Sequence, residues 1–240
     1  EKLHTLAAFM SFIVCAVYFL TRKRLAVCAA LSAAFTVMLT GYFICRNRFD
    51  EELRIHILGR KDEAVIAVTY GGRTDVFDLT GDRKNPDHLY KFLTAYGIES
   101  INSLYLDTAS NYIASAYESK LYAFDTECVM SHEDIILCEE QRICSQLPFY
   151  TKACTVNANV YTADMRDGVL TVEAYGKRIA VCIDEDTAQP ECDYLICGDR
   201  EVDEKLVFSR YAAPDGIICS GENIEFTLYP DGKTYTRRLS

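Results

Sequence analysis

The chain has 240 residues, half of them hydrophobic, which suits one α/β domain of about 190 residues and a smaller additional segment. Its charge is uneven, because residues 1–49 carry six Lys/Arg and one acidic residue, whereas residues 50–240 carry 19 Lys/Arg and 34 acidic residues, a net charge of −15. Such an acidic part lacks the basic surface that general nucleic-acid binding requires, although it leaves room for a local basic patch.

The first 48 residues contain two long apolar stretches, 3–20 and 25–45, on either side of the basic loop 21–24. At about 1.5 Å of rise per residue, each stretch is long enough to cross a bilayer as a helix. Residues 1–48 are therefore predicted to form a transmembrane helical hairpin. Because basic loops favour the cytoplasm, we expect a multi-pass protein of the cell membrane with its large domain on the outer face.

Two other interpretations of the apolar stretches fit less well. A cleaved signal peptide would not be followed at once by a second long apolar stretch, and two buried helices of a soluble protein would show polar stripes. Because the chain begins at Glu1 and enters the first stretch directly, we expect a fragment of a longer polytopic membrane protein.

Residues 49–240 form the predicted soluble domain, which opens with a run of strands. Alternating apolar residues and glycine turns predict three of them, at residues 52–58, 64–70 and 73–79. Asn85-Pro86 then begins a helix that ends at Gly97. A short buried strand around Leu104 and Leu106 follows.

After this strand come a polar turn over residues 107–111, a helix that starts near Tyr112, and another strand at 120–124. The rest of the chain is predicted to contain further strands at 156–162, 169–174, 177–183, 194–197 and 216–219, a short helix at 202–211, and a closing hairpin about Asp231-Gly232. Strands and helices in two such halves predict a four-layer αββα sandwich of the α+β class.

The turn at residues 107–111 resembles the metal-binding loop of the metallo-β-lactamase fold, in which a strand ends in His-x-His-x-Asp-His and a helix follows. Laid on that pattern, Asp107 falls at the first His, Ala109 at the second, Asn111 at the Asp and Tyr112 at the last His. The resemblance implies a metallo-hydrolase scaffold that has lost its metal ligands and, with them, its catalytic activity.

Further motifs are similar, in order and spacing, to the C-terminal half of the ComEC-type DNA-internalisation (competence) proteins, which join transmembrane helices to a metallo-β-lactamase-like domain. Residues 77–81, 97–102 and 214–223 resemble three of the motifs of that family. Residues 178–186 resemble the strand whose Asp bridges the metals, and residues 197–201 stand where the family has Val-Pro-His-His-Gly-Ser, without either His.

This resemblance implies a membrane-anchored, catalytically inactive domain that takes part in DNA uptake across the membrane. Its partners would be the membrane, single-stranded DNA and other subunits of a DNA-uptake machinery. Acidic residues near the degenerate ligand positions would form a remnant pocket, made of Asp78, Asp107, Asp184 or Asp186, and Asp199. No cofactor is expected, and a divalent cation bound weakly by these carboxylates is the alternative.

Two other functions stay open, a metal-dependent hydrolase or nuclease with carboxylate ligands and a membrane-tethered interaction domain unrelated to DNA. The histidines at positions 4, 56, 88 and 132 all lie outside the predicted metal loop. Ser110, Cys219 and Ser220 are nucleophile types, but the nearby sequence offers no His to activate them. The sequence therefore predicts no catalytic residue.

Overall fold

The computed structural model divides the chain into two compact units, residues 1–50 and residues 51–240. It describes residues 51–59, 63–107, 111–132, 150–166, 168–182, 191–197, 216–219 and 223–239, together with the helical residues Phe35 and Met38 of the first unit. The second unit contains two sheets and two helices among these residues.

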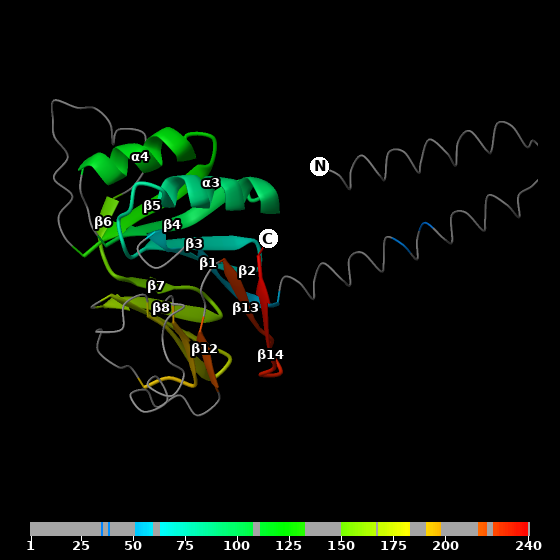
Figure 1. The fold of residues 1–240 in the computed structure, drawn as a ribbon. Coiled ribbons are helices and arrows are strands. Elements are labelled where there is room, and N and C mark those ends of the chain that lie inside the picture. The colour runs from blue at the N-terminus through cyan, green and yellow to red at the C-terminus, as the bar shows by residue number, and fades with distance from the viewer. Residues whose placement is uncertain are drawn as a thin grey trace, which may run out of the picture. The chain divides into compact units, whose positions relative to one another are not determined.

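Sheet 1 has eight strands in the order β14-β13-β1-β2-β3-β4-β5-β6 (Figure 1). Their bounds are β1 Leu53–Leu58, β2 Val65–Tyr70, β3 Arg73–Asp78, β4 Ser100–Leu106, β5 Asp125–Ser131, β6 Tyr150–Lys152, β13 Ile224–Leu228 and β14 Thr234–Arg238. Strands β3 to β6 run parallel to one another, and the other neighbours are antiparallel.

Sheet 2 has six strands in the order β12-β11-β10-β9-β8-β7. Their bounds are β7 Thr155–Asn157, β8 Tyr161–Arg166, β9 Val169–Ala174, β10 Lys177–Cys182, β11 Tyr194–Cys197 and β12 Gly216–Cys219. Strands β7 to β10 form antiparallel pairs, and β10 to β12 are parallel.

The main hydrophobic core lies between the two sheets. Strand alternation points every second side chain of each sheet into it, so that Ile55, Phe77 and Tyr105 of sheet 1 join the same buried cluster as Val172 and Ile179 of sheet 2. Figure 1 shows the two sheets as successive layers.

The opposite face of sheet 1 is covered by the helices α3 (Asn85–Tyr96) and α4 (Asn111–Leu121) (Figure 1). Leu93 of α3 and Tyr117 of α4 are fully buried in a second cluster with Leu104 of β4. Gly97 ends α3 in the left-handed conformation, with a φ of 65°, as the sequence predicts.

The predicted αββα sandwich is wrong. The part of the chain that the structure describes is mostly β, with 14 strands and two full helices, and both helices lie against sheet 1. Tight turns such as Tyr175-Gly176 join the antiparallel neighbours of sheet 2, and such connections need no helix. The short helix predicted at 202–211 lies outside the described residues.

The predicted transmembrane hairpin is a second correction. No helix among the residues that are described is long and apolar enough to cross a membrane. The predicted spans 3–20 and 25–45 lie outside those residues, apart from Phe35 and Met38. The prediction of a multi-pass membrane protein rested on the length and apolarity of the two stretches alone.

Two strands are also misplaced in the prediction. Residues 156–162, predicted as one strand, contain the end of β7, a turn and the start of β8. Residues 120–124, predicted as a strand, contain the end of α4 and a turn, and the strand β5 begins only at Asp125. The strands β1, β2 and β3 and the hairpin of β13 and β14 are confirmed within one or two residues.

Candidate functional site at the strand ends

The carboxyl ends of the parallel strands of both sheets lie at one end of the second unit. Tyr161, at the start of β8, hydrogen-bonds to Asp75 in the first half of β3. Farther along β8, the backbone N–H of Met165 donates to the carbonyl oxygen of Cys154, and the preceding Ala153 donates to the carbonyl oxygen of Ser131 at the end of β5. Strand β8 therefore runs in the direction of β3 and β4, and so does β10, because β9 is antiparallel to both β8 and β10. Ligands commonly bind at such an edge of a parallel sheet.

Asp78, the last residue of β3, links this strand to both helices through hydrogen bonds. Its Oδ1 accepts hydrogen bonds from the backbone N–H groups of Thr80 and Gly81, at 3.2 and 2.9 Å, and from Nδ2 of Asn85 at 2.6 Å. Its Oδ2 accepts a hydrogen bond from the hydroxyl of Tyr117 at 2.7 Å. Burial raises the pKa of Asp78, and these hydrogen bonds oppose that shift.

Asp78 and Asp107 do not share one pocket. The side chain of Asp78 reaches Asn85 of α3 and Tyr117 of α4, on the helix-covered face of sheet 1. Asp107 contacts the hydroxyl of Tyr105, whose ring belongs to the core between the sheets. Successive side chains of a strand point to opposite faces, so the two carboxylates lie on opposite sides of sheet 1 although Asp107 N donates to Asp78 O at 3.0 Å.

The other predicted site residues are only partly described. Asn111 and Tyr112 form the first turn of α4. The remaining ones, Ala109, Asp184, Asp186 and Asp199, lie outside the described residues.

Asp107 meets a residue that the sequence analysis left aside, His132. The Nδ1 atom of His132 lies 3.3 Å from Oδ1 of Asp107 and 3.1 Å from the hydroxyl oxygen of Tyr105. The Tyr105 hydroxyl is itself 3.3 Å from Oδ1 of Asp107, so three polar atoms form a closed triangle. The side chains of His132 and Asp107 are 47% and 29% exposed, which makes this triangle reachable from solvent.

The parallel register of β4 and β5 explains this meeting. Tyr105 stands opposite Met130, so the residues two positions farther along, Asp107 and His132, leave their strands side by side. Both point to the face of Tyr105 and Met130, which belong to the core between the sheets. We refer to Tyr105, Asp107 and His132 together as the strand-end site.

A histidine beside a carboxylate, as in the strand-end site, is an arrangement that can transfer protons. A carboxylate beside one ring nitrogen of a histidine favours the tautomer with the proton on that nitrogen and stabilises the imidazolium ion. Burial, and next the negative charge of Asp107, raise the pKa of the Tyr105 hydroxyl, which therefore stays protonated and can donate a hydrogen bond.

The segment that leads into sheet 2 lies beside the strand-end site, because the backbone N–H of Ala153 donates to the carbonyl oxygen of Ser131, the neighbour of His132, at 2.9 Å. Cys154 and Asp164 raise the pKa of the Tyr105 hydroxyl further, after burial and Asp107. Asp164 accepts hydrogen bonds from the hydroxyl of Thr155 at 2.6 Å and from Sγ of Cys154 at 3.8 Å, and it pairs with Nε of Arg166 at 2.7 Å. A guanidinium group therefore stands near this end of sheet 2.

Asp107 and His132 are both of metal-ligating type, but two ligands alone make a weak site. Within the described ranges, no group of three or more His, Cys, Asp or Glu side chains is placed to hold a metal ion. Asp78 is a poor candidate for a third ligand, because a cation would have to displace the hydrogen bonds on both of its oxygens.

Comparisons with known proteins leave the family open. No protein-family model matches the chain, and no curated protein matches it either. The resemblance to the ComEC-type proteins stays a prediction, and the four-layer fold that it implied is wrong for the described residues.

Proposed function

We propose that the unit of residues 51–240 is a hydrolase that uses His132 as its general acid and base, with Asp107 and Tyr105 as positioning residues. The observation that supports this function is the closed triangle of Nδ1 of His132, Oδ1 of Asp107 and the hydroxyl of Tyr105, with separations of 3.1 to 3.3 Å. The triangle lies at the carboxyl ends of parallel strands, where α/β sheets present their ligand sites.

In the proposed reaction, the imidazole of His132 takes a proton from water while the water oxygen attacks the carbonyl carbon or phosphorus of an ester. The imidazolium ion then returns that proton to the departing alkoxide or phenoxide oxygen, so that His132 is regenerated. Asp107 stabilises the imidazolium charge, and the Tyr105 hydroxyl fixes the position of the carboxylate.

The test is hydrolysis of two chromogenic esters, p-nitrophenyl acetate and bis(p-nitrophenyl) phosphate, by the full chain in the presence of a chelator. We expect turnover of one ester above the rate of a heat-denatured sample. The variant His132→Gln should lose about 100-fold of that rate and Asp107→Asn about tenfold, because the base is lost in one and only its orientation in the other.

The matched control is His88→Gln, since His88 lies on α3 beside Glu63 and away from the strand-end site. Its rate should equal that of the unmodified chain. If neither ester is hydrolysed, or if His132→Gln retains the full rate, the proposed function is wrong. If an ester is hydrolysed only when the chelator is left out, a metal-dependent reaction replaces the acid–base reaction.

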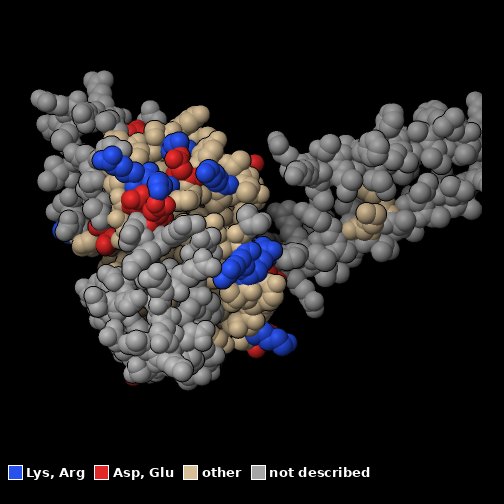
Figure 2. Space-filling model, viewed as in Figure 1, with Lys and Arg blue, Asp and Glu red and all other residues tan. Residues whose placement is uncertain are grey.

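A second candidate function is the binding of single-stranded DNA, which the exposed edge strand β14 favours. Tyr235 on this strand is 55% exposed, and Arg237 and Arg238 follow it. Figure 2 shows basic side chains at two separate places along β14, the lower one beside an acidic side chain, and a denser mixture of both signs of charge over α3 and α4. Exposed tyrosines stack on bases, and arginines contact phosphates.

This second function is tested by fluorescence anisotropy of a labelled single strand of DNA at low salt. We expect binding that weakens as salt is added, and a loss of about tenfold in affinity for the double variant Tyr235→Ala, Arg238→Gln. The control is Lys233→Gln, which removes a charge in the turn that precedes β14. Equal affinities of the chain and the double variant would contradict a DNA site on β14.

A further inference from the structure

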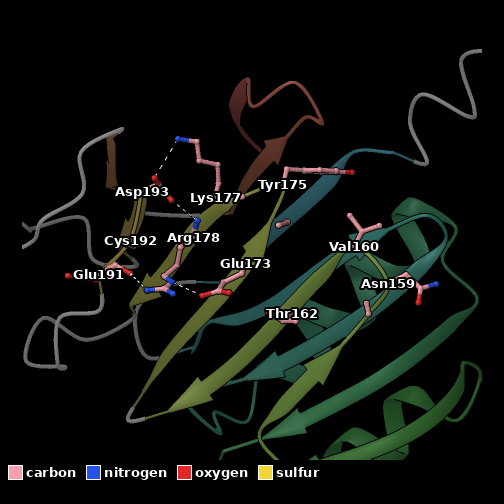
Figure 3. A pocket seen from close by; sticks show the side chains of 13 residues that line it. Asn159, Val160, Thr162, Glu173, Tyr175, Lys177, Arg178, Glu191, Cys192 and Asp193 are labelled. Atoms are coloured by element: carbon pink, nitrogen blue, oxygen red, sulfur yellow. Dashed lines mark hydrogen bonds and ion pairs between the residues drawn. The ribbon is translucent and has the colours of Figure 1, made fainter.

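A pocket of about 770 Å³ lies on sheet 2, at the end opposite to the strand-end site (Figure 3). The turn between β7 and β8, the outward face of β8, β9 and β10, and the segment before β11 form its walls. Lys177 and Tyr194 begin the parallel strands β10 and β11, so the pocket lies at the amino ends of these strands. Its size is in the range of small-molecule sites, roughly 300–1,000 Å³.

The strand register explains why the floor of this pocket is polar. Thr162, Glu173 and Arg178 stand opposite one another on β8, β9 and β10. Their neighbours Tyr161 and Ile179 point the other way, into the core between the sheets. The row Thr162-Glu173-Arg178 therefore faces outward, and Figure 3 shows Glu173 and Arg178 directed toward each other on this face.

Two ion pairs join four of the five charged side chains that line the pocket, and Glu191 is the fifth. Nε of Arg178 donates to Oε1 of Glu173 at 2.6 Å, and its Nη1 donates to the carbonyl oxygen of Glu191 at 3.4 Å. Nζ of Lys177 lies 3.5 Å from Oδ1 of Asp193, whose Oδ2 accepts the backbone N–H of Arg178 at 2.7 Å.

Among the described residues, the bonds of Glu173, Asp193 and Arg178 occupy only a part of their hydrogen-bonding capacity. A carboxylate offers about four lone-pair positions and a guanidinium five N–H donors, and each pair occupies only a part of them. The side chains of Thr162 and Asn159 add a hydroxyl and an amide to the same wall. An anionic ligand would have to break an existing ion pair to reach Lys177 or Arg178, whereas a neutral ligand with many hydroxyls can bond to both members of each pair.

The frame of the pocket is fixed by a tight turn. Tyr175 and Gly176 connect β9 and β10, and both have positive φ, 52° and 72°, as a two-residue hairpin of this kind requires. The Tyr175 hydroxyl donates to the carbonyl oxygen of Glu51 at 2.5 Å, which ties the turn to the segment before β1. The turn holds the row Thr162-Glu173-Arg178 in place before a ligand binds, which lowers the entropy cost of binding.

From these observations we infer that the pocket binds a neutral, hydroxyl-rich ligand, such as a short oligosaccharide. Glu173 and Asp193 accept hydrogen bonds from its hydroxyl groups, and Arg178 donates to its oxygens. This inference is independent of the strand-end site, because the two sites share no residue.

The experiment is a titration of the isotope-labelled full chain with three neutral trisaccharides, maltotriose, cellotriose and triacetylchitotriose, and with the charged tripeptides trilysine and triglutamate. We expect at least one trisaccharide to shift the amide signals of Thr162 and Gly176, with a dissociation constant of about 1 mM or below. The tripeptides should leave these signals unchanged.

Two variants locate the binding. Glu173→Gln should weaken binding of the trisaccharide by about tenfold, because it removes the ion pair that orients Arg178. The control Lys233→Gln removes an exposed ion pair of the same kind, with Asp231, in the turn between β13 and β14 and should bind as the unmodified chain does.

Either of two results would overturn the inference. One is the absence of any shift with all three trisaccharides, which is read on the unmodified chain and so does not depend on the folding of a variant. The other is tighter binding of a charged tripeptide than of any trisaccharide at the same signals.

Discussion

At the scale of single residues, a carboxylate owes its role to the groups that surround it. Asp78 and Asp107 follow one another at the ends of neighbouring strands, and the sequence predicts the same role for both. The structure separates them, because four hydrogen bonds hold Asp78 between β3 and the two helices, whereas Asp107 meets His132. Only Asp107 keeps a side chain that is available for chemistry.

The hydrogen bond from Tyr117 to Asp78 predicts that Tyr117→Phe lowers the stability of the fold. This change leaves the buried Oδ2 of Asp78 without its hydroxyl partner, so the free energy of unfolding should fall by about 1.5–3 kcal/mol. Tyr122→Phe is the control, since Tyr122 is 79% exposed just after α4 and its loss should cost less than about 0.5 kcal/mol. Urea denaturation of the full chain measures both, and equal stabilities of the two variants would show that Asp78 does not hold α4.

His56 on β1 predicts how stability depends on pH. Burial lowers the pKa of His56 to about 4, with the guanidinium groups of Arg54 and Arg237 acting in the same direction and Glu225 opposing them. Its Nδ1 has no hydrogen-bond partner among the described groups, and Glu225 Oε2 is 3.5 Å away. The unfolded chain, with an ordinary histidine pKa near 6.5, therefore binds the proton more strongly than the folded chain does.

The free energy of unfolding should accordingly fall as the pH is lowered from about 6.5 to about 4, by about 3 kcal/mol in all from this residue. In His56→Phe, which keeps a ring against Phe92 and Tyr96, this contribution disappears and the decline over the same range should be shallower. Denaturation at a series of pH values measures the two slopes. Parallel curves for the two chains would contradict a depressed pKa at His56.

At the scale of elements, local pattern predicts what local contacts decide. The strands β1 to β3, the start of α3 at Asn85-Pro86 and its end at Gly97 follow from alternation, proline and glycine. The boundary between α4 and β5 does not, because the apolar run Leu121 to Phe124 looks like a strand. Its residues are the helix end and a turn, and the strand that follows begins with alternating acidic residues.

The strand-end site lies beyond local pattern for the same reason. Asp107 and His132 are 25 positions apart, and only the parallel register of β4 and β5 brings them together. Recognising residues 125–131 as a strand parallel to β4 would have indicated this pairing. The sequence shows His132 itself, but it does not show that Asp107 lies beside it.

The turn after β1 gives a prediction at this scale. Gly59 has a φ of 91°, and a Cβ atom there would collide with the backbone carbonyl of Glu63. Gly59→Ala should therefore lower the free energy of unfolding by at least about 2 kcal/mol, through both strain and collision. Gly72→Ala, in the turn between β2 and β3, is the control with positive φ but open space around the added atom. Thermal melts compare the stabilities of the two variants. An equal loss of stability in both would show that the collision with Glu63 does not contribute.

At the scale of the whole unit, two sheets face each other across one core. A hydrogen bond also connects the two sheets, because the buried carboxylate of Asp75 on β3 accepts one from Tyr161 of sheet 2. Arg73 and Ser103 of sheet 1 donate to the same carboxylate. This arrangement aligns the strands of the two sheets, so that one end of the unit of residues 51–240 carries the strand-end site and the other end of sheet 2 carries the polar pocket. The position of both sites depends on the alignment of the sheets.

The central claim is that Asp107 acts through His132 as one acid–base unit. Its most direct test is a double-mutant cycle of ester hydrolysis by the unmodified chain, Asp107→Asn, His132→Gln and the double variant. We expect the double variant to be slower than His132→Gln by no more than about twofold, because the carboxylate has nothing to orient once the imidazole is gone. Losses that multiply in the double variant would contradict the account.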